Sequence, residues 1–321
     1  MSRARENDEN DMTQSSSRKV VYIAIAANVA IALCKYVAAF ATGSAAMLAE
    51  AFHSTADSCN ELLLLVGIRR SERPPDELHP FGHGKELYFW SLIVAIVIFG
   101  LGGGLSLHDG LSRLLHPVPS TSPQWNYLVL GFAAIFEGYS WIVSRRELKA
   151  RGRRHRQSTW RVIRASKDPT VFTVFLEDSA ALIGMAIAFV GIFLSLRLNN
   201  PYWDAGASLL IGLVLIGVAI VLAIESRELL LGERAHLAQV RKVRSIIQSE
   251  PSVREVGDLF TLQFGPDQIL LAVSIHFDPN LRVRDLEPTI ERLERKIQKE
   301  EPAIKRIFIE AEALKKKKRA A

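Results

Sequence analysis

The sequence predicts a membrane protein with an all-α transmembrane domain of six helices, followed by a small α/β domain. The first observation is a set of six long apolar stretches, and the second is a change to short amphipathic segments after Glu225. The third is the concentration of Lys and Arg in alternate connections between the apolar stretches. A bilayer core of about 30 Å requires about 20 helical residues per span. The six stretches are Val20–Phe40, Ala45–Gly67, Leu87–Leu107, Tyr127–Val143, Val171–Leu196 and Ala205–Ile224.

The composition supports this class because the apolar residues and the charges occupy different parts of the chain. Hydrophobic residues make up 49% of the 321 residues, and the formal net charge is +6. The only cysteines, Cys34 and Cys59, stand alone in apolar runs, which excludes a disulfide framework and favours packing as small hydrophobic side chains. The basic clusters flank the apolar stretches, so they favour contact with membrane lipids, and no nucleic-acid partner is expected.

The distribution of positive charge predicts the orientation. Ten Lys and Arg residues lie between Arg145 and Lys167, and four more follow the second stretch, whereas the connections on the opposite face carry only Arg113 and Arg197. Short cytoplasmic loops carry the excess of Lys and Arg. We therefore expect a multi-pass protein of a bacterial inner membrane, with both termini in the cytoplasm.

The region after Glu225 predicts a cytoplasmic domain with the element order αββαβ. Residues 236–250 and Leu286–Lys299 are amphipathic at helical spacing. Leu259–Phe264, Ile269–Phe277 and Ile304–Glu310 are strand-like, and Gly265-Pro266-Asp267 between the first two is a hairpin signal. The expected division is a disordered cytoplasmic tail at 1–18, a transport-type membrane domain at 19–232, the α/β domain at 233–312 and a basic tail at 313–321.

Charged side chains inside two of the apolar stretches are candidate metal ligands. His53 and Asp57 are four residues apart on one helix face in the second stretch, and Glu177 and Asp178 lie in the fifth. A charge at mid-membrane costs about 2.5–3.5 kcal/mol on insertion scales, so such groups either pair or coordinate something. The spans run in opposite directions and place Asp57 and Asp178 at similar depths, which predicts one site for a divalent cation such as zinc.

The alternative for these groups is a hydrogen-bond network between helices, with neutral side chains. Lys35 and Glu137 fit this alternative better, since a membrane lysine or glutamate more often snorkels or pairs than binds a substrate.

The connection between the second and third stretches carries a second cluster. Asp76, His79 and His83 lie within eight residues, and Pro80, Gly82 and Gly84 oppose a regular helix. The loop can therefore curl so that all three side chains reach one ion. The alternative is a polar loop whose histidines bond to the backbone.

These motifs, in their order along the chain, resemble the cation diffusion facilitator family. The set is HSTAD on the second stretch, HPFGHGKE in the next loop, a Gly-rich third stretch ending GLSRLLHP, an acidic fifth stretch and an αββαβ tail. The resemblance implies a homodimeric, proton-coupled exporter of zinc or a related metal, with a ferredoxin-like cytoplasmic domain. It assigns transport ligands to His53, Asp57 and Asp178 and loop ligands to Asp76, His79 and His83. It implies a transporter without enzymatic activity or a prosthetic group, whose cargo is zinc first, with manganese, iron or cobalt as other candidates.

One departure from the family pattern concerns the fourth transport ligand. Relatives with a tetrahedral zinc site have a histidine four residues before the aspartate of the fifth span, whereas this chain has Val174. The sequence leaves Glu177, Glu50 or water as the replacement, and FLEDSAALIG is similar to the branch around zinc transporter nine.

Two alternatives concern the cytoplasmic domain. The positions that many family members fill with His and Asp fall on Glu287, Glu310 and Glu312, with His276 nearby. Exposed carboxylates of this kind more often stay solvated than bind metal. The rival function is a membrane-anchored metal sensor or scaffold that signals through this domain.

Overall fold

A computed structural model describes residues 28–117, 123–155 and 167–312, and these residues form two compact units. A helical unit contains the described residues up to Gly67, from Trp90 to His155 and from Pro169 to Glu225. An α/β unit contains Ile68–Phe89, the described residues 167–168 and the chain from Ser226. The expected tails at 1–18 and 313–321, the start of the first stretch and part of the basic segment before Lys167 lie outside the described residues.

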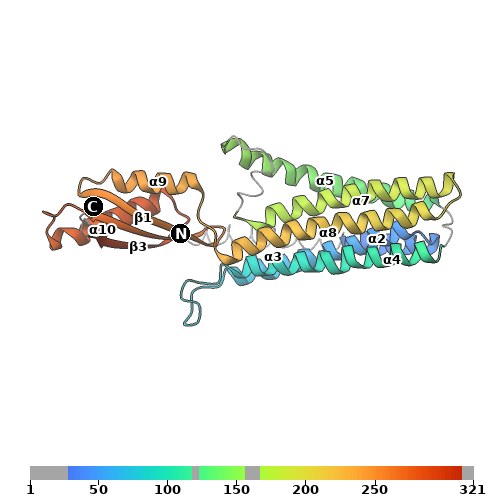
Figure 1. The fold of residues 1–321 in the computed structure, drawn as a ribbon, viewed down its shortest axis with the longest axis horizontal. Helices are drawn as coiled ribbons and strands as arrows, with labels where there is room; N and C mark the ends of the chain where they lie inside the picture. The colour runs from blue at the N-terminus through green and yellow to red at the C-terminus, as the bar shows by residue number, and fades with distance from the viewer. Residues whose placement is uncertain (1–27, 118–122, 156–166, 313–321) are drawn as a thin grey trace, which may run out of the picture. The chain divides into compact units, whose positions relative to one another are not determined.

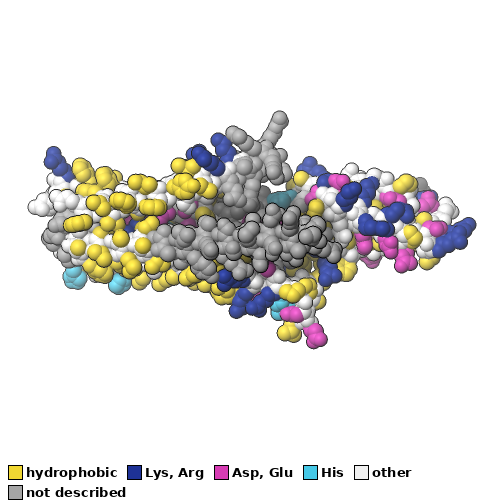
Figure 2. All heavy atoms as spheres, turned by 180° about the vertical axis from the view of Figure 1, so that it is seen from behind, with side chains coloured by type: hydrophobic (Ala, Val, Ile, Leu, Met, Phe, Trp, Pro, Cys, Tyr) yellow, Lys and Arg dark blue, Asp and Glu magenta, His cyan; other side chains and the backbone are white. Residues whose placement is uncertain are grey.

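The helical unit is built from long helices that correspond to the six apolar stretches (Figure 1). Its elements are a helix at Asn28–Thr42, α2 (Ala45–Ser71), α3 (Glu86–Val97), η1 (Ile98–Gly104), α4 (Leu105–Leu115), α5 (Pro123–His155), α7 (Pro169–Arg197) and α8 (Tyr202–Leu231). The segments α3, η1 and α4 follow one another without a break. Figure 2 shows that hydrophobic side chains cover much of the visible surface of this unit, as expected for helices that face lipid.

Four described helical segments are long and apolar enough to cross a membrane: Glu86–Leu115, Gln124–Arg146, Phe172–Arg197 and Tyr202–Leu231. The helix at Asn28–Thr42 is shorter in its described part. Helix α2 is 27 residues long, but it carries Glu50, Asp57 and Glu61 along its length. The structure therefore supports a helical membrane domain, and the count of six spans stays a prediction.

The π-helical segment η1 lies where the sequence is IFGLGGG. Its glycines allow close helix packing, since a Cβ on Gly103 would come 3.1 Å from the carbonyl oxygen of Gly212 on α8. π-Helical turns are rare and cluster at functional positions. The sequence pattern predicted a continuous helix here, and apolar periodicity alone carries no signal for the local widening.

The start of α2 is fixed by a residue from another helix. The buried carboxylate of Asp204 on α8 accepts hydrogen bonds from the Ser44 hydroxyl at 2.7 Å and from the Ala45 N–H at 2.5 Å. A carboxylate stabilises the free N–H groups and the positive end of a helix. Asp204 therefore sets the position of α2, the helix that carries His53 and Asp57.

The α/β unit contains a three-stranded mixed sheet with the predicted order of elements. They are α9 (Leu237–Gln248), β1 (Val253–Gly265), β2 (Gln268–Phe277), α10 (Val283–Glu300) and β3 (Ile304–Glu312). The strand order is β1-β2-β3, with β1 antiparallel and β3 parallel to β2. The predicted hairpin turn is confirmed, because β1 ends at Gly265 and β2 begins at Gln268.

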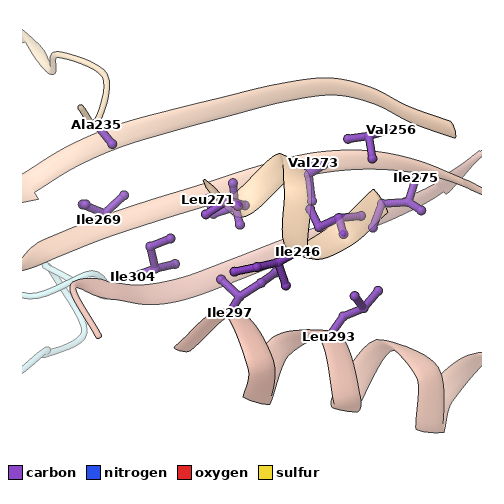
Figure 3. Packing of buried hydrophobic residues seen from close by; sticks show 12 residues of the cluster. Ala235, Ile246, Val256, Ile269, Leu271, Val273, Ile275, Leu293, Ile297 and Ile304 are labelled. Carbon is purple, nitrogen blue, oxygen red and sulfur yellow. The ribbon is translucent and has the colours of Figure 1, made fainter. Parts of the chain in front are cut away.

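The core of this unit lies between one face of the sheet and the two helices (Figure 3). Leu271, Val273 and Ile275 alternate along β2 and meet Leu293 and Ile297 of α10. Strand β1 begins six residues before the predicted start at Leu259. Register shifts at Val253/Glu255 and Val256/Leu259 interrupt the alternation there, so the sequence pattern is lost while the pairing continues.

Candidate metal sites

The first candidate site lies on the buried face of α2. His53 Nδ1 lies 3.4 Å from Asp57 Oδ1, and the side chains of His53 and Asp57 are only 1% and 15% exposed. Both ring nitrogens of His53 and Asp57 Oδ1 have no hydrogen-bond partner within the described chain. Buried polar atoms are normally satisfied. An imidazole and a carboxylate with free ligand atoms in an apolar unit fit a divalent cation of the zinc type.

The two acids of α7 point to different neighbours. Glu177 Oε1 accepts a hydrogen bond of 2.7 Å from Asn60 Nδ2 on α2. Asp178 Oδ2 instead accepts from two hydroxyls of α5, Ser140 Oγ at 2.9 Å and Ser144 Oγ at 3.2 Å. Both acids are buried, whereas Val174, one turn before Asp178, is 36% exposed.

The structure therefore brings His53 and Asp57 together and holds Asp178 on a separate set of partners. Among the residues that the structure describes, only Asp76, His79 and His83 form a group of three or more potential ligands with all ligand atoms within 4.8 Å of one another. The four intramembrane residues share one unit, but in this conformation they do not close around a single point.

Asn60 is a buried neighbour of the candidate site that sequence reasoning missed. It is fully buried, holds Glu177 and leaves its own Oδ1 without a partner within the described chain. It lies seven residues after His53 and three after Asp57, so it belongs to the same face of α2. That spacing was the only feature of the sequence that could have indicated Asn60.

Lys35 forms a buried ion pair, as its sequence context predicted. Its Nζ lies 3.0 Å from Glu50 Oε2 and donates to Ser54 Oγ at 2.8 Å, and both charged side chains are 0% exposed. Gly184 of α7 leaves the space for Glu50, because a Cβ there would collide with Glu50 Oε1. Lys35 therefore neutralises the charge of Glu50, which disfavours it as the fourth transport ligand, although Glu50 Oε1 has no hydrogen-bond partner within the described chain. Glu137 is partly buried on α5.

The second candidate site is the loop before α3. Asp76 Oδ1 accepts from the His79 N–H at 2.6 Å and lies 3.2 Å from His79 Nδ1, while Asp76 Oδ2 lies 2.9 Å from His83 Nε2. Gly82 makes the curl possible, since its φ of +88° is a conformation that other residues rarely adopt. The loop therefore forms the three-residue cluster that the sequence predicted.

The loop cluster is suited chemically to a cation. The His79 N–H and the His83 ring, which bond to the carboxylate, hold the pKa of Asp76 below its usual range, so this side chain is ionised at neutral pH. Zinc bonds of about 2.0–2.2 Å place tetrahedral ligand atoms roughly 3.4 Å apart, so only small shifts are needed for two histidines and one aspartate to bind. The fourth position would remain open to water.

The loop is anchored on the sheet of its own unit. The ring of Phe81 lies 5.3 Å from that of Phe264 at the end of β1 and 6.5 Å from that of Phe308 on β3. Gly84 packs directly on the backbone of Phe264, where a Cβ would not fit. Anchoring residues therefore alternate with the ligand candidates His79 and His83.

The acids of the α/β unit do not form a third cluster in the described chain. His276 on β2 and Glu312 on β3 are opposite each other in register, and Glu310 accepts a hydrogen bond from Ser274 at 3.3 Å. Glu287 is exposed on α10.

Comparison with known proteins identifies the family. Residues 21–231 match the model of the cation efflux transmembrane domain, and residues 236–314 match the cytoplasmic domain of cation efflux proteins. The chain belongs to the cation diffusion facilitator family. It therefore contains a cation efflux transmembrane domain followed by the cytoplasmic domain of cation efflux proteins.

Relatives within the family have different cargoes in their names. The chain is 35% identical over 266 residues to the human mitochondrial proton-coupled zinc antiporter SLC30A9, covering 83% of this chain and 47% of that protein. It is 30% identical to metal tolerance protein C4 of Arabidopsis thaliana, covering 88% and 62% of the two chains. It is 24% identical to the manganese efflux system protein MneP of Bacillus subtilis, covering 84% and 86%. The chain thus spans about half the length of its SLC30A9 relatives.

Proposed function

We propose that this chain exports divalent cations, zinc foremost, from the cytoplasm in exchange for protons. The observation that carries the proposal is the pair His53 and Asp57, buried in a helical membrane unit with ligand atoms that nothing in the described chain satisfies. The similarity to proton-coupled zinc antiporters supports the same cargo and the same coupling. The cargo crosses without any bond of its own being made or broken, so no enzymatic step is involved.

The proposed transport site consists of His53, Asp57 and Asp178, with Glu177 as the fourth ligand. Glu177 is favoured over Glu50 because Asn60 holds it toward α2 without adding a charge, whereas the cation of Lys35 already neutralises Glu50. Asp178 leaves Ser140 and Ser144 when the site closes around the cation. A relative movement of α5, α7 and α2 would therefore assemble the site and then open it to the other side of the membrane.

Proton exchange follows from competition for the same atoms. A metal requires deprotonated ligands, so binding releases protons and protonation releases the metal. Histidine titrates near pH 6.5 when unperturbed, which makes an imidazole such as His53 suited to exchange under physiological conditions.

The architecture proposed for the whole molecule has six spans, with the membrane domain at 19–232 and a ferredoxin-like cytoplasmic domain at 233–312. The protein would work as a homodimer in a bacterial inner membrane with both termini in the cytoplasm. The matched cytoplasmic dimerisation domain and the basic connections support this arrangement.

The loop site, Asp76 with His79 and His83, is proposed to collect metal on the cytoplasmic side. The loop joins the end of α2 to the start of α3, so the proposed loop ligands directly adjoin two helices of the membrane domain in the sequence.

The double variant His79→Ala/His83→Ala is expected to lower metal affinity and slow transport severalfold without abolishing it, because the loop lies outside the membrane path. Metal binding and flux measured on the purified protein test this. The control is His108→Ala/His116→Ala, which removes two exposed histidines of the helical unit and should leave both quantities unchanged. Complete loss of flux in the loop variant would make the loop part of the obligatory route.

Val174→His is expected to sharpen the preference for zinc over manganese and cobalt. With one imidazole and three carboxylates the wild-type site is rich in oxygen, and such sites discriminate less among these metals than sites with two imidazoles. Metal competition assays on the wild type and the variant test this, with Val190→His, at another exposed position of α7, as the control. Equal rejection of manganese and cobalt by the wild type would mean that the present ligands already form a selective site.

A further inference from the structure

A second cavity of the α/β unit has a chemistry that metal transport does not use. It has a volume of about 360 Å³ and lies between the loop after α2, the β1–β2 hairpin and the start of β3. Three cations border it, Arg73 from the loop and Lys305 and Arg306 from β3, whereas Glu72 is the only acid in its described lining.

The two cations of β3 reach this cavity because the strand is irregular there. Ile269 of β2 pairs with Ile304, but Leu270 pairs with Arg306, so Lys305 has no partner in the register. Ile304 and Ile307 both pack into the core of the unit. Two consecutive residues therefore lie outside the core, and a bulge of this kind redirects a side chain. Lys305 and Arg306 are both exposed and both border the cavity.

The third cation is held at the cavity by the sequence of its loop. Arg73 lies two residues after the end of α2 and precedes Pro74 and Pro75, which restrict the backbone before them to extended conformations. Its side chain, like those of Lys305 and Arg306, makes no hydrogen bond or ion pair with another described residue. Lys242 of the same unit, by contrast, is paired with Glu300 and Glu301.

Apart from Glu72 and Gln268, the remaining described side chains of the lining are apolar. Pro75, Phe81, Phe264 and Leu270 contribute to the lining. A free phosphate ion would gain nothing from these side chains, whereas an amphiphile would place its anionic group on the cations and its glycerol and upper acyl carbons on the rings. The helix α2, which Arg73 follows, has its other end in the helical membrane unit. Lys and Arg clusters that follow a membrane helix on the cytoplasmic side attract anionic lipid headgroups.

We propose that Arg73, Lys305 and Arg306 form a binding site for the phosphate group of an anionic phospholipid. This site is separate from both metal sites and does not depend on the proposed cargo. Since Phe81 lines the cavity and also anchors the metal-binding loop on Phe264, a bound lipid would stabilise the loop in its anchored position.

The test uses the full-length protein, purified in detergent and freed of lipid. Short-chain phosphatidylglycerol, short-chain phosphatidylcholine and inorganic phosphate are titrated separately, and binding is followed by native mass spectrometry and thermal unfolding. Phosphatidylglycerol is expected to bind and to raise the unfolding temperature more than phosphatidylcholine. Arg73→Gln/Arg306→Gln should weaken the binding of phosphatidylglycerol by about tenfold or more, since each Lys or Arg near an anionic headgroup contributes to the binding affinity.

The matched control is Arg241→Gln/Lys299→Gln, which removes two exposed cations from α9 and α10 of the same unit. The control should bind phosphatidylglycerol like the wild type. If both double variants lost the same amount of phosphatidylglycerol affinity, the binding would depend only on general surface charge, and the proposed site would be wrong. A different result would be that inorganic phosphate raises the unfolding temperature as much as phosphatidylglycerol does, and that the Arg73→Gln/Arg306→Gln variant loses this effect too. That result would show that the ligand is a free anion and would overturn the assignment to lipid.

Discussion

Asp57→Ala is expected to abolish zinc transport while the protein still folds. Asp57 provides one of the few ligand atoms that have no partner within the described chain, and no other described carboxylate lies beside the His53 ring. Removing it deletes a ligand of the proposed site, and no described Lys or Arg loses a counter-ion, because Asp57 pairs with neither. Zinc flux in reconstituted vesicles and thermal unfolding in detergent measure the two effects separately.

Asp109→Ala is the control, since it removes a partly buried carboxylate of α4 that pairs with Arg113 and has no place in the proposed site. It should transport zinc. Transport by Asp57→Ala at the wild-type rate would make the ligand assignment wrong. If Asp57→Ala failed to fold whereas Asp57→Asn folded and transported zinc, the intramembrane polar groups would be a structural network.

Lys35→Met is expected to cause a large loss of stability. The change leaves Glu50 fully buried without its counter-ion, and breaking a buried pair in this way costs about 3–5 kcal/mol. The double variant Lys35→Met/Glu50→Gln removes both charges and should recover most of that loss. Thermal unfolding of the two variants tests the prediction, with Lys242→Met, which breaks exposed ion pairs, as a control with little effect.

The same double variant tests the ligand assignment. Because Glu50 is held by Lys35 and is not counted among the transport ligands, the double variant should still carry zinc. A stable double variant that has lost zinc binding would show that Glu50 coordinates the metal and would replace Glu177 as the fourth ligand.

The parts of the molecule that follow from local pattern were predictable. Asp76, His79 and His83 are close in sequence, and the Pro and Gly residues around them exclude a helix, so their convergence could be inferred. The αββαβ order followed from amphipathic periods of helix and strand. Lys35 was expected to snorkel or to pair because a membrane-buried charge is costly, and it pairs with Glu50.

The parts that depend on contacts between distant segments were not predictable. A single sequence does not reveal that Asn60 bonds to Glu177, 117 residues away. It also does not reveal that Asp178, unlike the adjacent Glu177, bonds to a hydroxyl group on α5. The first residues of β1 and the bulge at Lys305 were unpredictable for the same reason. Pairing with β2 sets their conformation, and the alternating sequence pattern is interrupted at both places. The periodicity of one sequence predicts which face of a helix or strand a residue occupies. Which residue it contacts on another element can be seen only in the three-dimensional structure.

The most direct test of proton-coupled export is zinc flux in proteoliposomes with an imposed pH gradient, followed with a fluorescent zinc indicator and an internal pH probe. With an acidic interior, zinc should accumulate inside as protons leave, a protonophore should abolish the accumulation, and the Asp57→Ala variant should show neither flux. Zinc entry that is equally fast without the gradient and without proton movement would contradict the coupling. The absence of any zinc flux from a folded wild-type protein would contradict transport itself and favour a membrane-anchored metal sensor.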